Sequence, residues 1–330
     1  MDGGDGEIAV ATPRDATERF AALRHWEMKP FFEEAPAMQI RIGYDIAFEC
    51  PQPTPMLMML RVHPSLGDRV IEHDYVASEP ALAIDTYLDG FGNLASRTVL
   101  PAGQTRLWAR GIVESDGEPD PIAPDARILP VQDLPEECLV YLLGSRYCET
   151  DHLGFIAWPL FGHLPENWQR VQAIVDYVHN HLTFNYALAR PTRTALEAHG
   201  EQLGVCRDFA HLAIALCRAM NIPARYCTGY LGDIGVPRDP APMDFSAWFE
   251  AYLGDRWYTF DARHNKPRIG RVVMARGRDA TDVALTNSFG NATLVNFSVV
   301  TEEIEPSSAG NAPGRPSELL GAVHPVAGVA

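Results

Sequence analysis

The sequence predicts an α+β protein, with a core in which a central helix packs on an antiparallel sheet and a small β-sandwich-like domain that precedes this core. Residues 38–115 hold short runs of alternating residues separated by turn signals, a pattern typical of β-strands. Residues 204–260 hold a long apolar helical stretch followed by strand-like runs. A helix followed by antiparallel strands favours an α+β layout.

The first half of the sequence has the pattern of a β-sandwich. Residues 39–46 alternate apolar and polar side chains at period two, as a half-buried strand does. We expect further strands at residues 56–62, 69–75, 81–87, 94–100 and 107–113, with turns at 89–93 and 101–103. Several short strands at this spacing indicate a sandwich.

The second half has helical periodicity before its strands. Residues 165–182 place apolar side chains at three- and four-residue steps, which predicts a helix with one buried face. Residues 204–220 are nearly all apolar from Phe209 onward and predict a buried central helix that ends at Asn221 and Pro223. We expect strands at 224–231, 247–253 and 256–260.

These patterns divide the chain into five regions. They are an N-terminal extension (1–37, with a helical stretch at 16–28), a β-rich domain (38–115), a linker and connecting segment (116–150), a core domain (151–304) and a disordered tail (305–330). Since strand-like sequence begins only at Met38, one hypothesis is that Met38 is the natural start.

Composition excludes several classes of function. The formal net charge of -16 argues against a nucleic-acid surface and against anchoring to an anionic membrane, because both need clustered basic residues. No segment approaches the roughly 20 consecutive apolar residues that cross a bilayer, and residues 1–12 lack the features of a signal peptide. We therefore expect a cytoplasmic protein.

The cysteines fit a reducing compartment. None of the six forms a C-x-x-C pair, so we expect free thiols rather than disulfides or structural zinc. The sequence also lacks a calcium loop of the EF-hand type. No cofactor or metal is expected.

Cys206 is the candidate nucleophile. It falls in the first turn of the predicted central helix, just after Gly204, where unpaired N–H groups and the helix dipole favour a thiolate. Its pKa is thus expected below the free value of about 8.5. The alternative is a cysteine that acts only as a small core hydrophobe, which is our interpretation of Cys217 and Cys227.

Three stretches resemble the transglutaminase-like superfamily: GVCRDFAHLAIALCRAMNIPARYCTGYL, DFSAWFEAYLGDRWYTFDARHNKPRIGR and GRDATDVALTNSFG. The resemblance covers roughly residues 150–300, and the β-rich segment before it resembles a region that accompanies bacterial members. The family has a papain-like core with a Cys–His–Asp triad. By position, the resemblance implies that Cys206 is the nucleophile and Asp261 the aspartate, while Ser246 occupies the position of the histidine.

With serine at position 246, the chain lacks the imidazole that pairs with the thiolate and protonates the departing amine in the family. The loss of this general acid–base assistance lowers the rate by about 10²–10⁴. His264, three residues after Asp261, is our preferred substitute base, with a structural loop histidine as the alternative. His199 lies in a predicted loop, and His211 is expected to pack in the core. Asp261 could instead cap a turn.

The resemblance implies a cysteine hydrolase or amidase, of the protease type, that acts on a peptide or amide through a Cys206 thioester, with a peptide or protein as its substrate. The alternative is a catalytically impaired pseudoenzyme that binds a peptide or protein partner in the cleft that serves as the active site in the family. The sequence leaves open the substrate, the choice between hydrolysis and acyl transfer, the oligomeric state, and whether Ser246 was introduced to inactivate the protein.

Overall fold

The computed structural model describes residues 38–304, so the predicted extension (1–37) and tail (305–330) lie outside the described range. The strands are β1 (Met38–Cys50), β2 (Thr54–Met58), β3 (Val70–Glu72), β4 (Ala77–Glu79), β5 (Asp85–Leu88), β6 (Leu94–Leu100), β7 (Gly103–Ser115), β8 (Thr183–Phe184), β9 (Leu203–Gly204), β10 (Ala224–Tyr230), β11 (Ser246–Leu253), β12 (Arg256–Phe260), β13 (Val272–Gly277), β14 (Thr286–Ser288) and β15 (Thr293–Ile304). The α-helices are α2 (Glu136–Leu139), α3 (Thr150–Phe161), α4 (Trp168–His181), α5 (Ala195–Glu201) and α6 (Cys206–Ala219). Short 3-10 turns are η1 (Pro64–Arg69), η2 (Val131–Asp133), η3 (Val140–Leu142) and η4 (Tyr186–Leu188).

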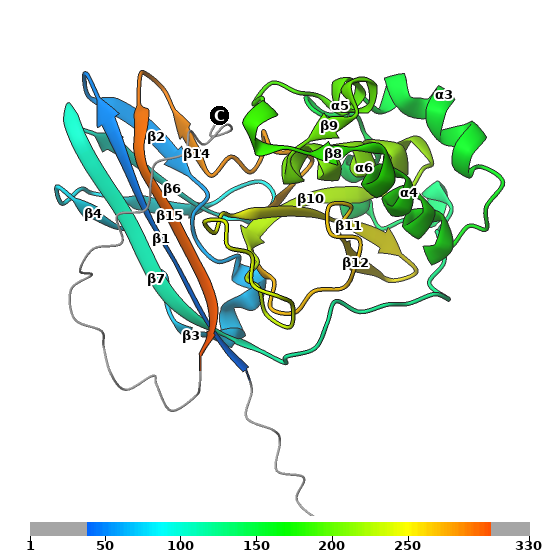
Figure 1. Ribbon diagram of the computed structural model, residues 1–330, viewed down its shortest axis with the longest axis horizontal. Coiled ribbons are helices and arrows are strands. Elements are labelled where there is room, and N and C mark those ends of the chain that lie inside the picture. The colour runs from blue at the N-terminus through cyan, green and yellow to red at the C-terminus, as the bar shows by residue number, and fades with distance from the viewer. Residues whose placement is uncertain (1–37, 305–330) are drawn as a thin grey trace, which may run out of the picture. The chain divides into compact units, whose positions relative to one another are not determined.

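Two antiparallel sheets form the β-rich part of the chain, as Figure 1 shows. One has the order β15-β1-β7-β3, with β4 also paired to β7, and the other has the order β14-β2-β6-β5. An apolar cluster contains Ile40, Ile42 and Ile46 of β1, together with Met58 of β2 and Leu107 of β7. Because this cluster draws side chains from both sheets, the predicted β-sandwich is confirmed.

The last strands of the described chain belong to these same sheets. β15 pairs with β1 from Gln39↔Ile304 to Glu49↔Thr293, and β14 pairs with β2. The sandwich is therefore completed by residues 286–304, which follow the helical core in sequence. The predicted boundary between residues 38–115 and 151–304 remains a prediction, and the strand pairing draws on both sides of it.

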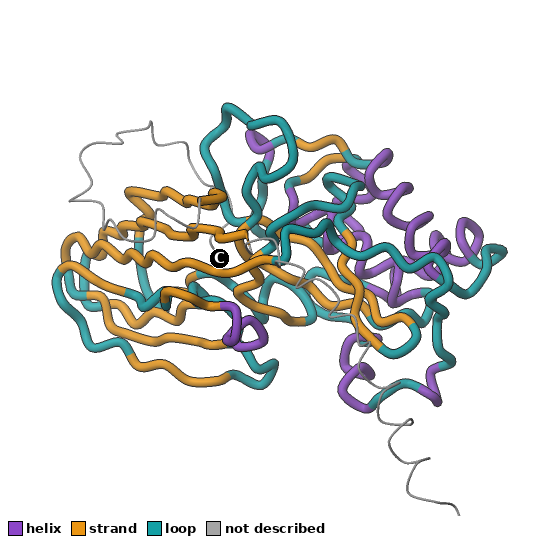
Figure 2. The backbone as a smooth tube through the Cα atoms, turned by 90° about the horizontal axis from the view of Figure 1, so that it is seen from below, coloured by secondary structure: helices purple, strands orange, loops and turns teal. Residues whose placement is uncertain are grey.

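The core places α6 against the sheet β12-β11-β10-β13. All eight residues of β11 are buried, and so are the residues of α6 from Arg207 to Arg218. In Figure 2 most of the helices lie on the right side of the view and the long strands of the sandwich lie on the left. This arrangement confirms the predicted α+β core.

Local sequence explains the ends of the central helix. α6 ends at Ala219, and Asn221 follows with a φ of 59°, a left-handed conformation that asparagine tolerates. The predicted helix at 165–182 is α4, and Asn167 caps it by accepting a hydrogen bond from the N–H of Gln169 at 3.0 Å. Both helices lie where the apolar periodicity placed them.

Several strands differ in length from the predicted ones. β3 and β5 are shorter than the strands predicted at 69–75 and 81–87, and β4 lies between them. The Pro/Asp-rich segment after β7 contacts the core: the carboxylate of Asp120 accepts hydrogen bonds from the N–H of Arg268 at 2.9 Å and from Nε of Arg271 at 2.8 Å. This segment therefore brings a charged partner to the region of the site.

Between residues 38 and 304, the structure has no helix with the length and apolar character needed to span a membrane. The six cysteines are all unpaired.

Candidate active site

Cys206 is the first residue of α6, as the sequence predicted. Asp208 fixes this helix end, since its Oδ2 accepts hydrogen bonds from the N–H of Val205 at 2.9 Å and from Nη1 of Arg193 at 3.1 Å. Gly204 makes the contact possible, because a Cβ there would lie 2.6 Å from the Cβ of Asp208. The thiol thus stands at a rigid helix N-terminus, where the first N–H groups have no helical acceptor.

A pocket of about 330 Å³ opens beside this thiol. Cys206 and Ser246 both line it, so two of the four predicted site residues come together here. Its other lining residues are Arg146, Tyr147, Tyr186, Val205, Arg207, Tyr226, Thr228, Asp244, Phe245, Ala247, Ala280, Thr281, Val283, Ala284, Leu285, Asn287 and Phe297. The pocket therefore joins the N-terminus of α6, the start of β11 and the segment before β14.

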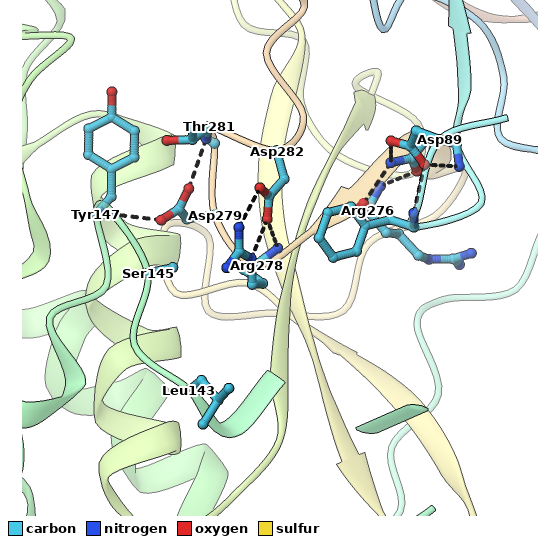
Figure 3. Close-up of polar contacts among 12 residues, drawn as sticks. Asp89, Leu143, Ser145, Tyr147, Arg276, Arg278, Asp279, Thr281 and Asp282 are labelled. Carbon is cyan, nitrogen blue, oxygen red and sulfur yellow. Dashed lines mark hydrogen bonds and ion pairs between the residues drawn. The ribbon is translucent and has the colours of Figure 1, made fainter. Parts of the chain in front are cut away.

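A hydrogen-bonded loop forms one wall of the pocket, and Figure 3 shows it. The carboxylate of Asp279 accepts from the N–H of Tyr147 and from the N–H of Thr281, both at 2.8 Å. Arg278 and Asp282 are paired next to it at 2.9 Å. These bonds hold Tyr147 and Thr281 in place as walls of the site.

Burial raises the pKa of the Cys206 thiol above its ordinary value. Arg263 and Arg207 act in the opposite direction, as does a hydrogen bond from the Ala247 backbone, whereas Asp244 raises the pKa further. The predicted lowering of this pKa is therefore wrong. The helix N-terminus is present, but removal of the sulfur from water outweighs it, and the resting group is a neutral thiol.

Ser246 begins β11 and is paired with Gly229 of β10. Its Oγ is buried and finds no hydrogen-bond partner among residues 38–304. Alternation along β11 puts residue 246 on the same face as Trp248, whose ring lies 5.0 Å from the Arg271 guanidinium. Residue 246 therefore lines the Cys206 pocket and shares a sheet face with Trp248, which contacts Arg271, a partner of Asp261.

Asp261 follows β12 and is a fully paired carboxylate. Its Oδ1 accepts from the N–H groups of Arg263 and His264, both at 3.0 Å. Its Oδ2 accepts from Nη2 of Arg271 at 2.9 Å and lies 2.9 Å from Nδ1 of His264. Burial alone would raise the pKa of Asp261, but Arg271 and the hydrogen bonds from His264 lower it well below its usual value.

Asp261 faces a different space from Cys206. It lines a second pocket of about 180 Å³, together with Asp120, Gln172 and Lys266. No hydrogen bond joins it to Ser246 within residues 38–304. The structure therefore keeps the predicted nucleophile and the predicted aspartate in separate surroundings.

His264 is held by Asp261, and it is not among the residues that line the Cys206 pocket. His211 is completely buried, and burial lowers its pKa to about 3. Its Nε2 accepts a hydrogen bond from the N–H of Ala280 at 3.1 Å, which confirms the expected core position. His199 lies on α5 and stacks on His181, with ring centroids 4.4 Å apart.

Sequence reasoning missed Asp244, Arg263 and Tyr186, which cluster near the thiol. Asp244 and Tyr186 line its pocket, and Arg263 lowers the pKa of Tyr186 against the larger effect of burial. Burial raises the pKa of Asp244 to about 6, against the opposing effects of the Phe245 N–H and Arg263. The one available signal was the position of Asp244, two residues before Ser246.

Metal ligands do not cluster in the part of the chain between residues 38 and 304: no group of three or more His, Cys, Asp or Glu side chains there could hold an ion. The chemistry available at the pocket is that of a thiol, a carboxyl group, three tyrosines and nearby guanidinium groups.

Comparisons with known proteins identify the family to which this fold belongs. The model of the transglutaminase-like superfamily matches residues 160–262. The crystal structure of a Cytophaga hutchinsonii protein, named "Putative Cysteine Protease", has a TM-score of 0.72 and 30% sequence identity, and the match covers 82% of this chain and 92% of that chain.

Two mycobacterial relatives share a shorter region. An uncharacterized protein of Mycobacterium leprae is 32% identical over 117 residues, which cover 33% of this chain and 40% of the relative. An uncharacterized protein of Mycobacterium tuberculosis is 32% identical over 115 residues, which cover 30% of this chain and 37% of the relative. The match thus spans less than half the length of these relatives. Together with the structural similarity over most of the Cytophaga protein, the family match shows that the chain belongs to the transglutaminase-like superfamily.

Proposed function

We propose that the protein is a cysteine hydrolase or amidase that acts on a peptide or protein amide through a thioester at Cys206. One observation carries this proposal: the thiol of Cys206 lies at the N-terminus of a buried helix and lines a pocket of about 330 Å³. A nucleophile in such a position can form a covalent acyl intermediate with a bound carbonyl group.

The helix end supplies a second element of this chemistry. At the start of α6 the N–H of Asp208 bonds the carbonyl of Val205 at 2.8 Å, which leaves the N–H groups of Cys206 and Arg207 without an acceptor inside the helix. When a thiol attacks a carbonyl group, negative charge develops on the carbonyl oxygen, and preorganised N–H donors stabilise it. The fixed helix end at Asp208 keeps these donors in position.

A binding protein without catalysis is the second candidate. Two observations favour it: the position assigned to the histidine holds Ser246, and burial raises the pKa of the Cys206 thiol. In that case the pocket would bind a peptide without reacting with it. Replacing Cys206 would then leave the affinity for the peptide unchanged.

Covalent trapping separates the two candidates. The protein is incubated with p-nitrophenyl acetate, quenched in acid and digested, and each cysteine is examined for an acetyl group by mass spectrometry. We expect acetylation at Cys206 that turns over with time and disappears in Cys206→Ala. Transfer of the acetyl group to added hydroxylamine would measure acyl transfer against hydrolysis. Absence of acetyl-Cys206 at every time point would favour the binding protein.

A further inference from the structure

The Cys206 pocket contains one carboxyl group. Of the lining residues, all of which belong to the described range 38–304, only Asp244 carries a carboxyl group, and none carries an imidazole. Asp244 stands two residues before Ser246, and the backbone of Ala247 forms a hydrogen bond with the Cys206 sulfur. The segment 244–247 therefore runs along the nucleophile, with the Asp244 carboxyl group in the same pocket.

The charged neighbours of Asp244 are few. Arg263, in the loop after β12, lowers the pKa of Asp244, and Asp244 in turn raises the pKa of the Cys206 thiol at the start of α6. Burial, Cys206 and Asp244 raise the pKa of Tyr186 in η4, and Arg263 lowers it. Arg207 lowers the pKa of the Cys206 thiol. Asp244 thus has one nearby cation and one nearby acid, and burial keeps the pKa of its carboxyl group at about 6. A group that titrates near neutral pH is suited to accept and return a proton.

We propose that Asp244 is the acid–base group of the Cys206 site, in the role that an imidazole at residue 246 would otherwise have. This inference rests on the proposed function, since it assigns the proton transfers of that reaction. It differs from the sequence-based choice of His264, which is bonded to Asp261 and does not line the pocket.

The proton and bond changes balance without a further reagent. The Asp244 carboxylate accepts the thiol proton as the sulfur bonds to the amide carbon. The C–N bond then breaks, and Asp244 gives that proton to the departing amine, which leaves a thioester on Cys206. In the second half, Asp244 takes a proton from water as the C–O bond forms, the C–S bond breaks, and the sulfur recovers the proton. Acid and product amine are released.

The test uses Asp244→Asn, a variant of nearly the same size. Asp255→Asn is the matched control, because it removes the same charge from the exposed turn between β11 and β12. Two esters probe the acid role: p-nitrophenyl acetate, whose leaving group departs without a proton, and phenyl acetate, whose leaving group needs one. Iodoacetamide probes the thiol itself, and a thermal unfolding scan checks that each variant is folded.

We expect Asp244→Asn to weaken both proton transfers, and the transfer to the leaving group more than the transfer from the thiol. Acylation by phenyl acetate should fall at least about 100-fold, while acylation by p-nitrophenyl acetate falls less than about tenfold. Alkylation of Cys206 at pH 7 should become slower, because the carboxylate that accepts the thiol proton is gone. Asp255→Asn should match the wild type in all three assays.

Three results would overturn the inference. They are an unchanged rate with phenyl acetate, an equal loss with both esters, and an alkylation profile of Cys206 that does not respond to Asp244→Asn. The proposed function fails by a different result, namely no acetyl group on Cys206 of the wild type. If acetyl-Cys206 forms and the variant shows no leaving-group dependence, only the role of Asp244 is lost.

Discussion

The pocket around Cys206 and the cluster around Asp261 both adjoin β11 near Ser246, and they differ in how their polar groups are paired. Each oxygen of Asp261 has two hydrogen-bonding partners, and its pKa is lowered. In the pocket, the Oγ of Ser246 is buried without a partner in the described chain, and the pKa values of Cys206 and Asp244 are raised. Charge is stabilised in the cluster and disfavoured in the pocket.

This difference shows what a single side chain does in such a site. An imidazole at residue 246 would be placed to bond Asp261 with one nitrogen and the Cys206 sulfur with the other. The Asp261 carboxylate would then stabilise the imidazolium, and the imidazolium would stabilise the thiolate. Serine is too short for this. The cluster keeps its stability through His264 and Arg271, and the pocket is left with a neutral thiol and a carboxyl group.

The substitution expected to have the largest effect on the acylation rate introduces an imidazole between the Cys206 pocket and the Asp261 cluster. Ser246→His is designed to put an imidazole beside Cys206, and we expect acylation by phenyl acetate to rise by up to about 10²–10⁴ because the imidazole adds general acid–base assistance to that of Asp244. Stopped-flow measurement of phenol release gives the rate. Ser246→Ala is the control and should show no gain. A folded Ser246→His protein with the wild-type rate would mean that the two regions cannot be bridged from this position.

The substitution with the next largest expected effect weakens the hydrogen-bonded cluster around Asp261 and leaves the Cys206 pocket unchanged. Asp261→Asn leaves the buried Arg271 guanidinium with a weaker partner, and we expect the free energy of unfolding at pH 7 to fall by about 3–5 kcal/mol. Because the pKa of Asp261 is lower in the folded protein than its unfolded value of about 3.9, its contribution is complete above that value. The contribution is lost as the pH falls through the folded pKa.

Urea denaturation of wild type and Asp261→Asn at pH 7 and pH 3 measures this dependence. The difference between the two proteins should be smaller at pH 3, because the Asp261 carboxyl group of the unfolded chain takes up a proton below about pH 3.9 while that of the folded protein stays charged. A difference that is equal at both pH values would show that Asp261 does not act through its charge.

The smallest effect is expected at His264. Its ring contributes one hydrogen bond to Asp261, so His264→Ala should lower the free energy of unfolding by about 1 kcal/mol. Acylation of Cys206 by either ester should stay within about threefold of the wild type, because the ring does not line the pocket. A loss of 100-fold would restore His264 as the base and displace Asp244.

Regular elements were predictable because their signals are local. The apolar periodicity located α4 and α6, Asn221 and Pro223 marked the end of α6, and alternation located β1 and β6. The order of the motifs located Cys206, Ser246 and Asp261. The pairing of β15 with β1 was not predictable in this way, since its partners lie about 250 residues apart and local pattern does not report on distant pairing.

The site could be predicted only in part, for physical reasons. A helix N-terminus is visible in a sequence, but the burial that raises the pKa of Cys206 arises from the surrounding fold. Asp244 and Arg263 lie in irregular segments without periodicity, so the sequence offered only the nearness of Asp244 to Ser246 as a signal and none for Arg263. Arg271 comes ten residues after Asp261, and only the folded chain brings the two together.

The pH dependence of alkylation at each cysteine tests the central claim most directly, which is that Cys206 is an accessible but neutral thiol in its pocket. We expect iodoacetamide to label Cys206 before the buried Cys217 and Cys227, with an apparent pKa above the free-thiol value of about 8.5. A Cys206 that reacts no faster than the other two, or one that is already fully thiolate below pH 7, would contradict it.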